Sequence, residues 1–138
     1  MAEDVRRVCS PRMSDDDVRL TVLRDVAAGF DSHDLDRIMA HFVDDCVFEA
    51  PRGADPHGRR VVGSAAVRAA FADRFAGIPD VRYLDDTHFV AGDRGVSEWL
   101  LSGTAVDGAR VEVRGCDIWT FRGAKIAIKA SFWKIRTP

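Results

Sequence analysis

Asp117 is the residue of this sequence best placed to transfer a proton. It lies in the middle of a β-prone segment, residues 110–121, along which side chains alternate between two faces. The face that carries Asp117 is otherwise apolar and consists of Val111, Val113, Gly115, Trp119 and Phe121. A carboxylate in such a place is desolvated, paired with a cation or directed into a cavity, and a desolvated carboxyl group can shuttle protons near neutral pH. We therefore expect Asp117 to be a catalytic acid or base, and a structural ion pair with an arginine is the alternative.

His57 is a second candidate for catalysis. It lies in residues 51–58, a loop rich in turn-forming residues. A histidine on a loop can act as a base or contact a substrate, because loops often carry functional groups. The alternative is a solvated side chain beside the arginines that follow it.

The other motifs predict neither a metal ion nor a cofactor. Cys9, Cys46 and Cys116 are an odd number of cysteines at wide spacing, which fits neither a disulfide framework nor a structural zinc site. No two histidines have the four-residue spacing of a helical metal site, and no glycine-rich phosphate loop follows a strand. We expect a protein that works without a cofactor.

A group of apolar side chains, mostly aromatic, is expected to form the wall of a pocket for a flat hydrophobic molecule. Its members are Phe48, Ala50, Phe71, Phe75, Trp99, Val113, Trp119 and Trp133. Trp99 is assigned to the inner face because Ser97, Leu101 and Gly103 make its side of the strand the more apolar one. Ordinary core packing is the alternative for each of these residues. In the last strand, either Ile126, Ile128, Ala130 and Phe132 or Ala127, Lys129, Ser131 and Trp133 face inward, and the pattern does not choose between them.

Periodicity and turn residues predict the elements that hold these side chains. Apolar spacing predicts one helix over residues 15–30, a second helix with Leu35 and Phe42 on one face, and a third over residues 64–76. Short strands are expected at 46–50 and 59–62, and longer ones at 81–91, 96–106, 110–121 and 125–135, the first of them interrupted at Asp85 and Asp86. This order predicts an α+β domain in which three helices pack on one face of a curved, mostly antiparallel sheet.

The composition predicts one domain and excludes several classes of partner. The chain has 138 residues, which we divide into a loose N-terminal tail over residues 1–13 and a single domain over 14–138. Its net charge of −2 argues against nucleic-acid binding. No apolar run is long enough for a membrane span, and the N-terminal residues lack the apolar core of a signal peptide, so we expect a cytoplasmic protein.

Five segments make the chain resemble the SnoaL-like branch of the nuclear transport factor 2-like superfamily, which includes ketosteroid isomerases and polyketide cyclases. They are His33–Asp36, His41–Phe48, Val62–Ser64, Glu98–Thr104 and, as the most specific, Val113–Ile126. The resemblance covers about residues 15–134 and implies a cone-shaped α+β fold. It also implies a homodimer packed through the sheet.

The resemblance gives Asp117 a role but leaves its partners missing. Asp117 falls where ketosteroid isomerases have the oxyanion-hole aspartate and where SnoaL-like cyclases have an acid/base aspartate. The isomerases' general base falls on Ala50 and their first-helix tyrosine on about Val26, while the cyclases' histidine falls within 103–105, where there is none. A steroid isomerase mechanism is therefore not expected.

Two functions from different classes follow. The first is a cofactor-free cyclase, isomerase or dehydratase that acts on a hydrophobic polyketide-like or aromatic metabolite, with Asp117 as acid/base. The second is a non-catalytic module of the same fold that binds a hydrophobic ligand or associates with a partner. An epoxide hydrolase of the limonene type is a weaker alternative, because Arg114 falls on the strand face opposite Asp117. A second polar group within reach of Asp117, in a cavity open to water, would favour the enzyme.

Overall fold

The computed structural model describes residues 13–138 of the chain. The expected tail over residues 1–13 therefore lies, apart from Met13, outside the described residues. The helices are α2 (Asp15–Asp31), α3 (Leu35–Met39) and α4 (Ser64–Gly77). The strands are β1 (Phe42–Glu49), β2 (Arg60–Val62), β3 (Arg82–Ala91), β4 (Arg94–Thr104), β5 (Arg110–Arg122) and β6 (Lys125–Trp133). No helix among these residues is both long and apolar enough to cross a membrane.

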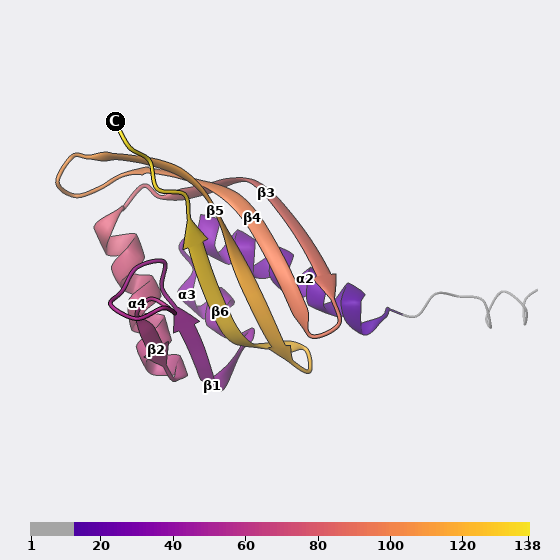
Figure 1. Cartoon of the computed structure of the whole chain (residues 1–138). Coiled ribbons are helices and arrows are strands. Elements are labelled where there is room, and N and C mark those ends of the chain that lie inside the picture. Colours follow the sequence, from indigo (N-terminus) through magenta and orange to yellow (C-terminus); the bar gives the residue numbers. More distant parts are fainter. Residues whose placement is uncertain (1–12) are drawn as a thin grey trace, which may run out of the picture.

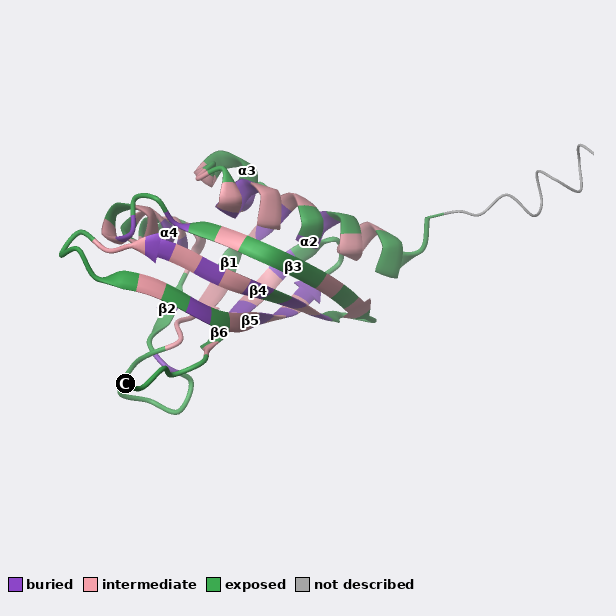
Figure 2. Ribbon diagram, turned by 90° about the horizontal axis from the view of Figure 1, so that it is seen from above, coloured by how far each residue is buried: buried purple, intermediate pink, exposed green. Residues whose placement is uncertain are grey.

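The strands form one sheet in the order β2-β1-β6-β5-β4-β3. Every neighbouring pair is antiparallel except β1 and β6, which are parallel. The three helices lie together on one face of this sheet and leave the other face uncovered (Figures 1 and 2). The expected α+β architecture, with three helices on a mostly antiparallel sheet, is confirmed.

Helix α2 begins where the sequence predicts and packs its apolar stripe against the sheet. Ser14 Oγ accepts a hydrogen bond from the Asp17 backbone N–H, and the Asp17 carboxylate accepts one from the Ser14 backbone N–H, so two end groups of the helix are satisfied. Val26 and Phe30 are buried on the inner side of the helix. The stripe thereby supplies one wall of the molecule's interior.

The second helix is shorter than predicted, and Phe42 belongs to a strand. Helix α3 ends at Met39, and β1 begins at Phe42. Phe42 pairs with Ile126 of β6, and the His41 carbonyl accepts a hydrogen bond from the Ile126 backbone N–H. This long-range pairing overrides the local helical spacing, because β1 must lie parallel to a strand that comes last in the chain.

A bulge in β6 resolves the ambiguity about its inner face. Phe121 pairs with Ile126, whereas Thr120 pairs with Ile128, so Ala127 is an extra residue in β6. Ile126 points inward before the bulge, and Lys129 and Ser131 are buried after it. Both predicted faces are therefore correct, each for one part of the strand.

A second bulge occurs at the interruption predicted in β3. Leu84 pairs with Leu100 and Thr87 pairs with Glu98, so β3 has one residue more than β4 here, and Asp85 has a φ of 50°. In a regular strand Tyr83 and His88 would face opposite sides. The extra residue puts both opposite inward-facing residues of β4, and both side chains reach the interior.

Candidate functional site

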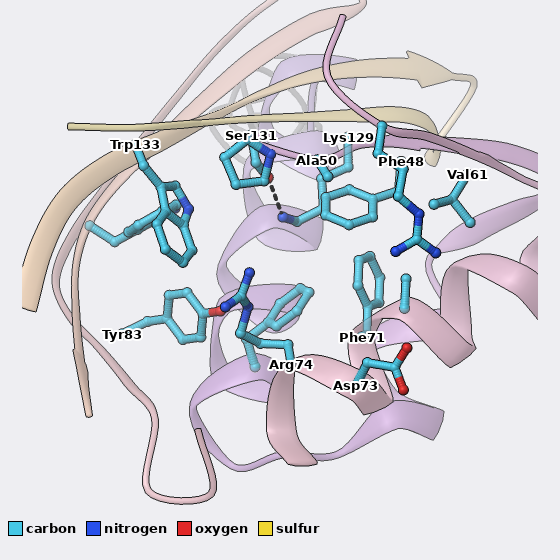
Figure 3. A pocket seen from close by; sticks show the side chains of 15 residues that line it. Phe48, Ala50, Val61, Phe71, Asp73, Arg74, Tyr83, Lys129, Ser131 and Trp133 are labelled. Atoms are coloured by element: carbon cyan, nitrogen blue, oxygen red, sulfur yellow. Dashed lines mark hydrogen bonds between the residues drawn. The ribbon is translucent and has the colours of Figure 1, made fainter. Parts of the chain in front are cut away.

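A pocket of about 220 Å³ lies between the helices and the inner face of the sheet. Its buried lining residues include Phe71, Trp99 and Lys129, whereas Arg59 and Asp73 are exposed and mark its mouth. Figure 3 shows the lining side chains. The lining residues are Phe30, Phe48, Ala50, Pro51, Arg59, Val61, Ala70, Phe71, Asp73, Arg74, Tyr83, Trp99, Lys129, Ser131 and Trp133. A concavity that combines apolar walls with a few convergent polar groups is typical of a small-molecule site.

Asp117 is buried below this pocket and accepts hydrogen bonds from three side chains. Trp99 Nε1 donates to Asp117 Oδ2 at 2.8 Å, while Lys129 Nζ and Ser131 Oγ donate to Oδ1 at 2.8 and 2.5 Å. Asp117 is 5% exposed, so these donors replace the water that a carboxylate would otherwise bind. The expected inward position of Asp117 is observed, and its ion-pair partner is a lysine.

The ammonium group of Lys129 lies in a cage of aromatic rings. Its Nζ is 4.9 to 5.6 Å from the ring centroids of Phe48, Phe30, Phe71 and Trp119. Burial lowers the pKa of Lys129, and the neighbouring Asp117 carboxylate opposes that shift. The aromatic faces also attract the cation, so the cage stabilises a charge that has lost its water.

Lys129 and Ser131 connect Asp117 to the pocket. Both line the 220 Å³ pocket, whereas Asp117 lines a separate space of about 20 Å³ next to Ser97 and Trp119. Lys129 Nζ also donates to Ser131 Oγ at 2.8 Å, so the three groups form one hydrogen-bonded cluster. A molecule in the pocket would touch the amine and the hydroxyl, and a proton could reach Asp117 through them.

Two further polar side chains face the pocket from its other side. The Arg74 guanidinium stacks over the Trp133 ring at 4.6 Å. The Tyr83 hydroxyl points toward Arg74 in Figure 3, and desolvation raises the pKa of Tyr83, which keeps its proton on. The pocket thus offers hydrogen-bond donors at both ends of an aromatic interior.

The structure brings five of the eight predicted wall residues to the pocket: Phe48, Ala50, Phe71, Trp99 and Trp133. The other three do not line it. Phe75 stacks on His33 at 4.3 Å, and Val113 is buried in the core cluster that also contains Val81 and Leu101. Trp119 lies deeper, where its Nε1 donates to Ser97 Oγ at 2.9 Å.

His57 is not brought to the pocket. It lies exposed in the 51–58 loop and is absent from the lining of the described cavities. The loop extends into solvent because its turn residues bond among themselves, with Gly58 N–H donating to the Asp55 carbonyl. Arg114 is also exposed, on the outer face of β5, as the strand alternation predicted.

Sequence reasoning did not select Lys129, Ser131, Tyr83 or Arg74 as site residues. Lys129 and Ser131 stood in one of the two alternatives for the last strand, and Ser131 is directly opposite Asp117 in the sheet. The alternation of Lys129, Ser131 and Trp133 was the available signal, and apolarity alone favoured neither face. Among residues 13–138 no group of His, Cys, Asp and Glu side chains could hold a metal ion.

Comparisons with known proteins identify the domain and its structural relatives. The family model described as the SnoaL-like domain matches residues 23–128. No curated protein matches the chain in sequence. A proposed polyketide cyclase from Xanthomonas campestris pv. campestris has a TM-score of 0.78 at 15% identity, over 88% of this chain and 93% of that one.

Two other solved structures have similar folds. TerC, co-crystallised with polyporic acid, has a TM-score of 0.73 at 19% identity, over 85% of this chain and 92% of TerC. A proposed isomerase from Bacillus subtilis has a TM-score of 0.75 at 18% identity, over 88% of this chain and 90% of the isomerase. At such identities these likenesses describe the fold.

Proposed function

The chain belongs to the SnoaL-like domain family, and from this membership and the site geometry we propose that it is a cofactor-free proton-transfer enzyme. Its substrate is a hydrophobic polyketide-like or aromatic metabolite, which it cyclises, isomerises or dehydrates. Asp117 is the acid/base, and Lys129 and Ser131 are the groups that touch the substrate. The observation that carries this proposal is the buried cluster of Asp117, Lys129 and Ser131 at the floor of an aromatic pocket.

The cluster supports the transfer of a proton from a bound substrate to Asp117 through Ser131. A substrate carbon next to a carbonyl gives its proton to Ser131 Oγ while the Ser131 hydroxyl proton moves to Asp117 Oδ1. The substrate becomes an enolate, and the Lys129 ammonium group stabilises its negative oxygen. The proton then returns to another atom of the substrate, or to the alkoxide that forms when the enolate attacks a second carbonyl. General acid–base catalysis of this kind accelerates reactions by about 10²- to 10⁴-fold.

The pocket supports a substrate with at least one flat ring. Phe48, Phe71 and Trp99 supply ring faces and edges, and the pocket of about 220 Å³ is larger than the engineered apolar cavity of about 150 Å³ that binds benzene. Among the structural relatives, TerC was crystallised with polyporic acid, and the Xanthomonas campestris protein is a proposed polyketide cyclase. An aromatic or polyketide-like ligand is consistent with both.

A non-catalytic binding module is the second candidate. Both carboxylate oxygens of Asp117 already accept hydrogen bonds, which is what a structural ion pair needs. In this function Asp117 and Lys129 only hold the pocket open for a hydrophobic ligand. The two candidates differ in whether the pocket removes a proton from a bound carbon acid.

A ring-opening probe distinguishes them. In 5-nitrobenzisoxazole a base removes the carbon-bound proton, the N–O bond breaks, a nitrile forms, and the oxygen leaves as a coloured phenolate. We expect the wild-type protein to open the probe about 10²-fold faster than Asp117→Asn combined with Lys129→Met. That double variant keeps an acceptor for Trp99 and leaves no buried charge. Lys125→Met, at the exposed start of β6, is the control. Equal rates for wild type and double variant would favour the binding module.

We also propose that the protein forms a homodimer through the uncovered face of the sheet. This outer face carries half-exposed apolar side chains on its central strands: Val96, Leu100, Ile118, Ile128, Ala130 and Phe132. Phe132 is 53% exposed. A second copy of the chain would remove this patch from water, and a two-fold axis would let the same face serve both subunits.

A further inference from the structure

Cationic side chains outnumber anionic ones around the pocket. Three cationic side chains line it, Arg59, Arg74 and Lys129, against one carboxylate, Asp73. Asp117 balances Lys129 from below. The arginine charges remain in excess at the mouth, so the pocket favours a negatively charged occupant.

Arg74 is held in place without a carboxylate partner. No Asp or Glu within residues 13–138 forms an ion pair with it. Figure 3 shows the Asp73 carboxylate directed away from the Arg74 guanidinium. Stacking over Trp133 at 4.6 Å orients the guanidinium and restricts its rotamers before any ligand binds.

Tyr83 adds a second unused donor at the same place. Its ring is fixed edge-on against Phe30 and Trp99, with centroid separations of 5.6 and 5.4 Å. Its backbone N–H donates to Asp31, while its hydroxyl forms no hydrogen bond with a side chain within residues 13–138 and, since no buried polar atom there lacks a partner, is open to the pocket. The hydroxyl points into the pocket toward Arg74 (Figure 3). A fixed phenol and a fixed guanidinium side by side form a ready acceptor site for an anionic oxygen.

We propose that the pocket takes an aromatic carboxylate, with the carboxylate held by Arg74 and Tyr83 and the ring directed toward Lys129. This inference rests on the proposed function for the identity of the site and adds the substrate class. A guanidinium matches the two oxygens of a carboxylate with two parallel hydrogen bonds, and such charge-assisted bonds are stronger than neutral ones. The carboxylate at the mouth would leave the other end of the ring beside the Lys129–Ser131 pair.

A matched pair of probes tests the charge preference. 2-Naphthoate and 2-naphthamide have the same ring and nearly the same shape, and only the first is ionised at neutral pH. Trp99 and Trp133 line the pocket, so their fluorescence can follow both titrations. We expect the wild-type protein to bind the naphthoate about tenfold or more tightly than the amide, as hydrogen bonds to a charged group allow.

Three variants test which residues cause the preference for the naphthoate over the amide. Arg74→Met keeps an unbranched side chain over Trp133 and should abolish the preference, while Tyr83→Phe should reduce it. Arg94→Met, at the exposed start of β4, should leave it unchanged. Equal affinity for the two probes, or a preference that survives Arg74→Met, would overturn the inference. Binding is measured without turnover, so a charge preference in a protein that does not open 5-nitrobenzisoxazole would refute the proposed enzyme and keep the anion site. Turnover of 5-nitrobenzisoxazole without a charge preference would refute the anion site and keep the proposed enzyme.

Discussion

Lys129 Nζ lies 2.8 Å from Asp117 Oδ1, and both side chains are less than a tenth exposed. Because the two residues lie on neighbouring strands, β5 and β6, the sheet itself brings them together. Both charges are largely removed from solvent, so water would compensate poorly for the loss of either partner. Removing one partner from a buried pair is far more damaging than removing both.

A double-mutant cycle should reveal this dependence. We expect Asp117→Asn and Lys129→Met each to lower the free energy of unfolding by about 3–5 kcal/mol, because each leaves a buried charge uncompensated. The combined variant should lose much less than the sum of the two. Urea unfolding gives all three values, and additive losses would contradict the mutual dependence of Asp117 and Lys129.

The Trp99 hydrogen bond to Asp117 should be measurable against a matched tryptophan. Trp99 and Trp133 both line the pocket, and only Trp99 donates its Nε1 hydrogen to a described side chain. Trp99→Phe should therefore cost about 1.5–3 kcal/mol more than Trp133→Phe, the range for a hydrogen bond to a charged group. Equal losses of unfolding free energy in the two variants would mean that the bond contributes nothing.

Local alternation was enough to predict which residues of the central strands face inward. The inner faces of β4 and β5, with Trp99, Val113, Asp117 and Trp119, agree with the structure because these strands pair without interruption from Arg94 to Thr104. The order of helices and strands also follows from periodicity and turn residues. These features depend on neighbours a few positions apart, which a sequence displays directly.

The partners of Asp117 depend on features that local patterns do not display. If β5 and β6 paired regularly from Arg122 and Lys125, Asp117 would lie opposite Ala130, and Ser131 would point outward. The bulge at Ala127 shifts the register so that Ser131 lies opposite Asp117. A similar shift at Asp85 turns Tyr83 and His88 to the same side. The sequence predicted an interruption at Asp85 and Asp86, but the pairing with the neighbouring strand is needed to show that one residue is extra there, and nothing in the local pattern marked Ala127.

Acid should destabilise the protein partly through Asp31. Arg82 donates two hydrogen bonds to the Asp31 carboxylate, at 2.7 and 2.9 Å, and lowers the pKa of Asp31 below its ordinary value. Between the lowered and the ordinary pKa the unfolded chain binds more protons, so stability increases with pH there. The contribution is complete above the ordinary pKa and is lost as the pH falls through the lowered one.

A comparison with Asp31→Asn tests whether the stability contributed by Asp31 increases with pH. Between about pH 6 and pH 2 the unfolding free energy of the wild type should fall more steeply than that of Asp31→Asn. Asp55→Asn, in the exposed 51–58 loop, should retain the wild-type slope. Identical slopes for wild type and Asp31→Asn would show that the pair with Arg82 does not contribute to acid sensitivity.

If the protein is a dimer through the outer face, one charged substitution on that face should halve the mass of the particle in solution. Phe132→Asp should convert a dimer into a monomer, because it replaces the most exposed side chain of the apolar patch with a carboxylate that would have to be buried. Val106→Asp is a matched control, since Val106 is 76% exposed and lies in the β4–β5 turn away from the patch. Light scattering at micromolar concentration gives the masses. A monomeric wild-type protein would contradict the proposed dimer.

Ser131→Ala tests the central claim, that a proton passes between the pocket and Asp117, most directly. The substitution removes the hydroxyl that lies between them and keeps the pair of Asp117 and Lys129. We expect the variant to bind 5-nitrobenzisoxazole with wild-type affinity and to open it about 10²-fold more slowly. A variant that opens the probe at the wild-type rate would contradict the account.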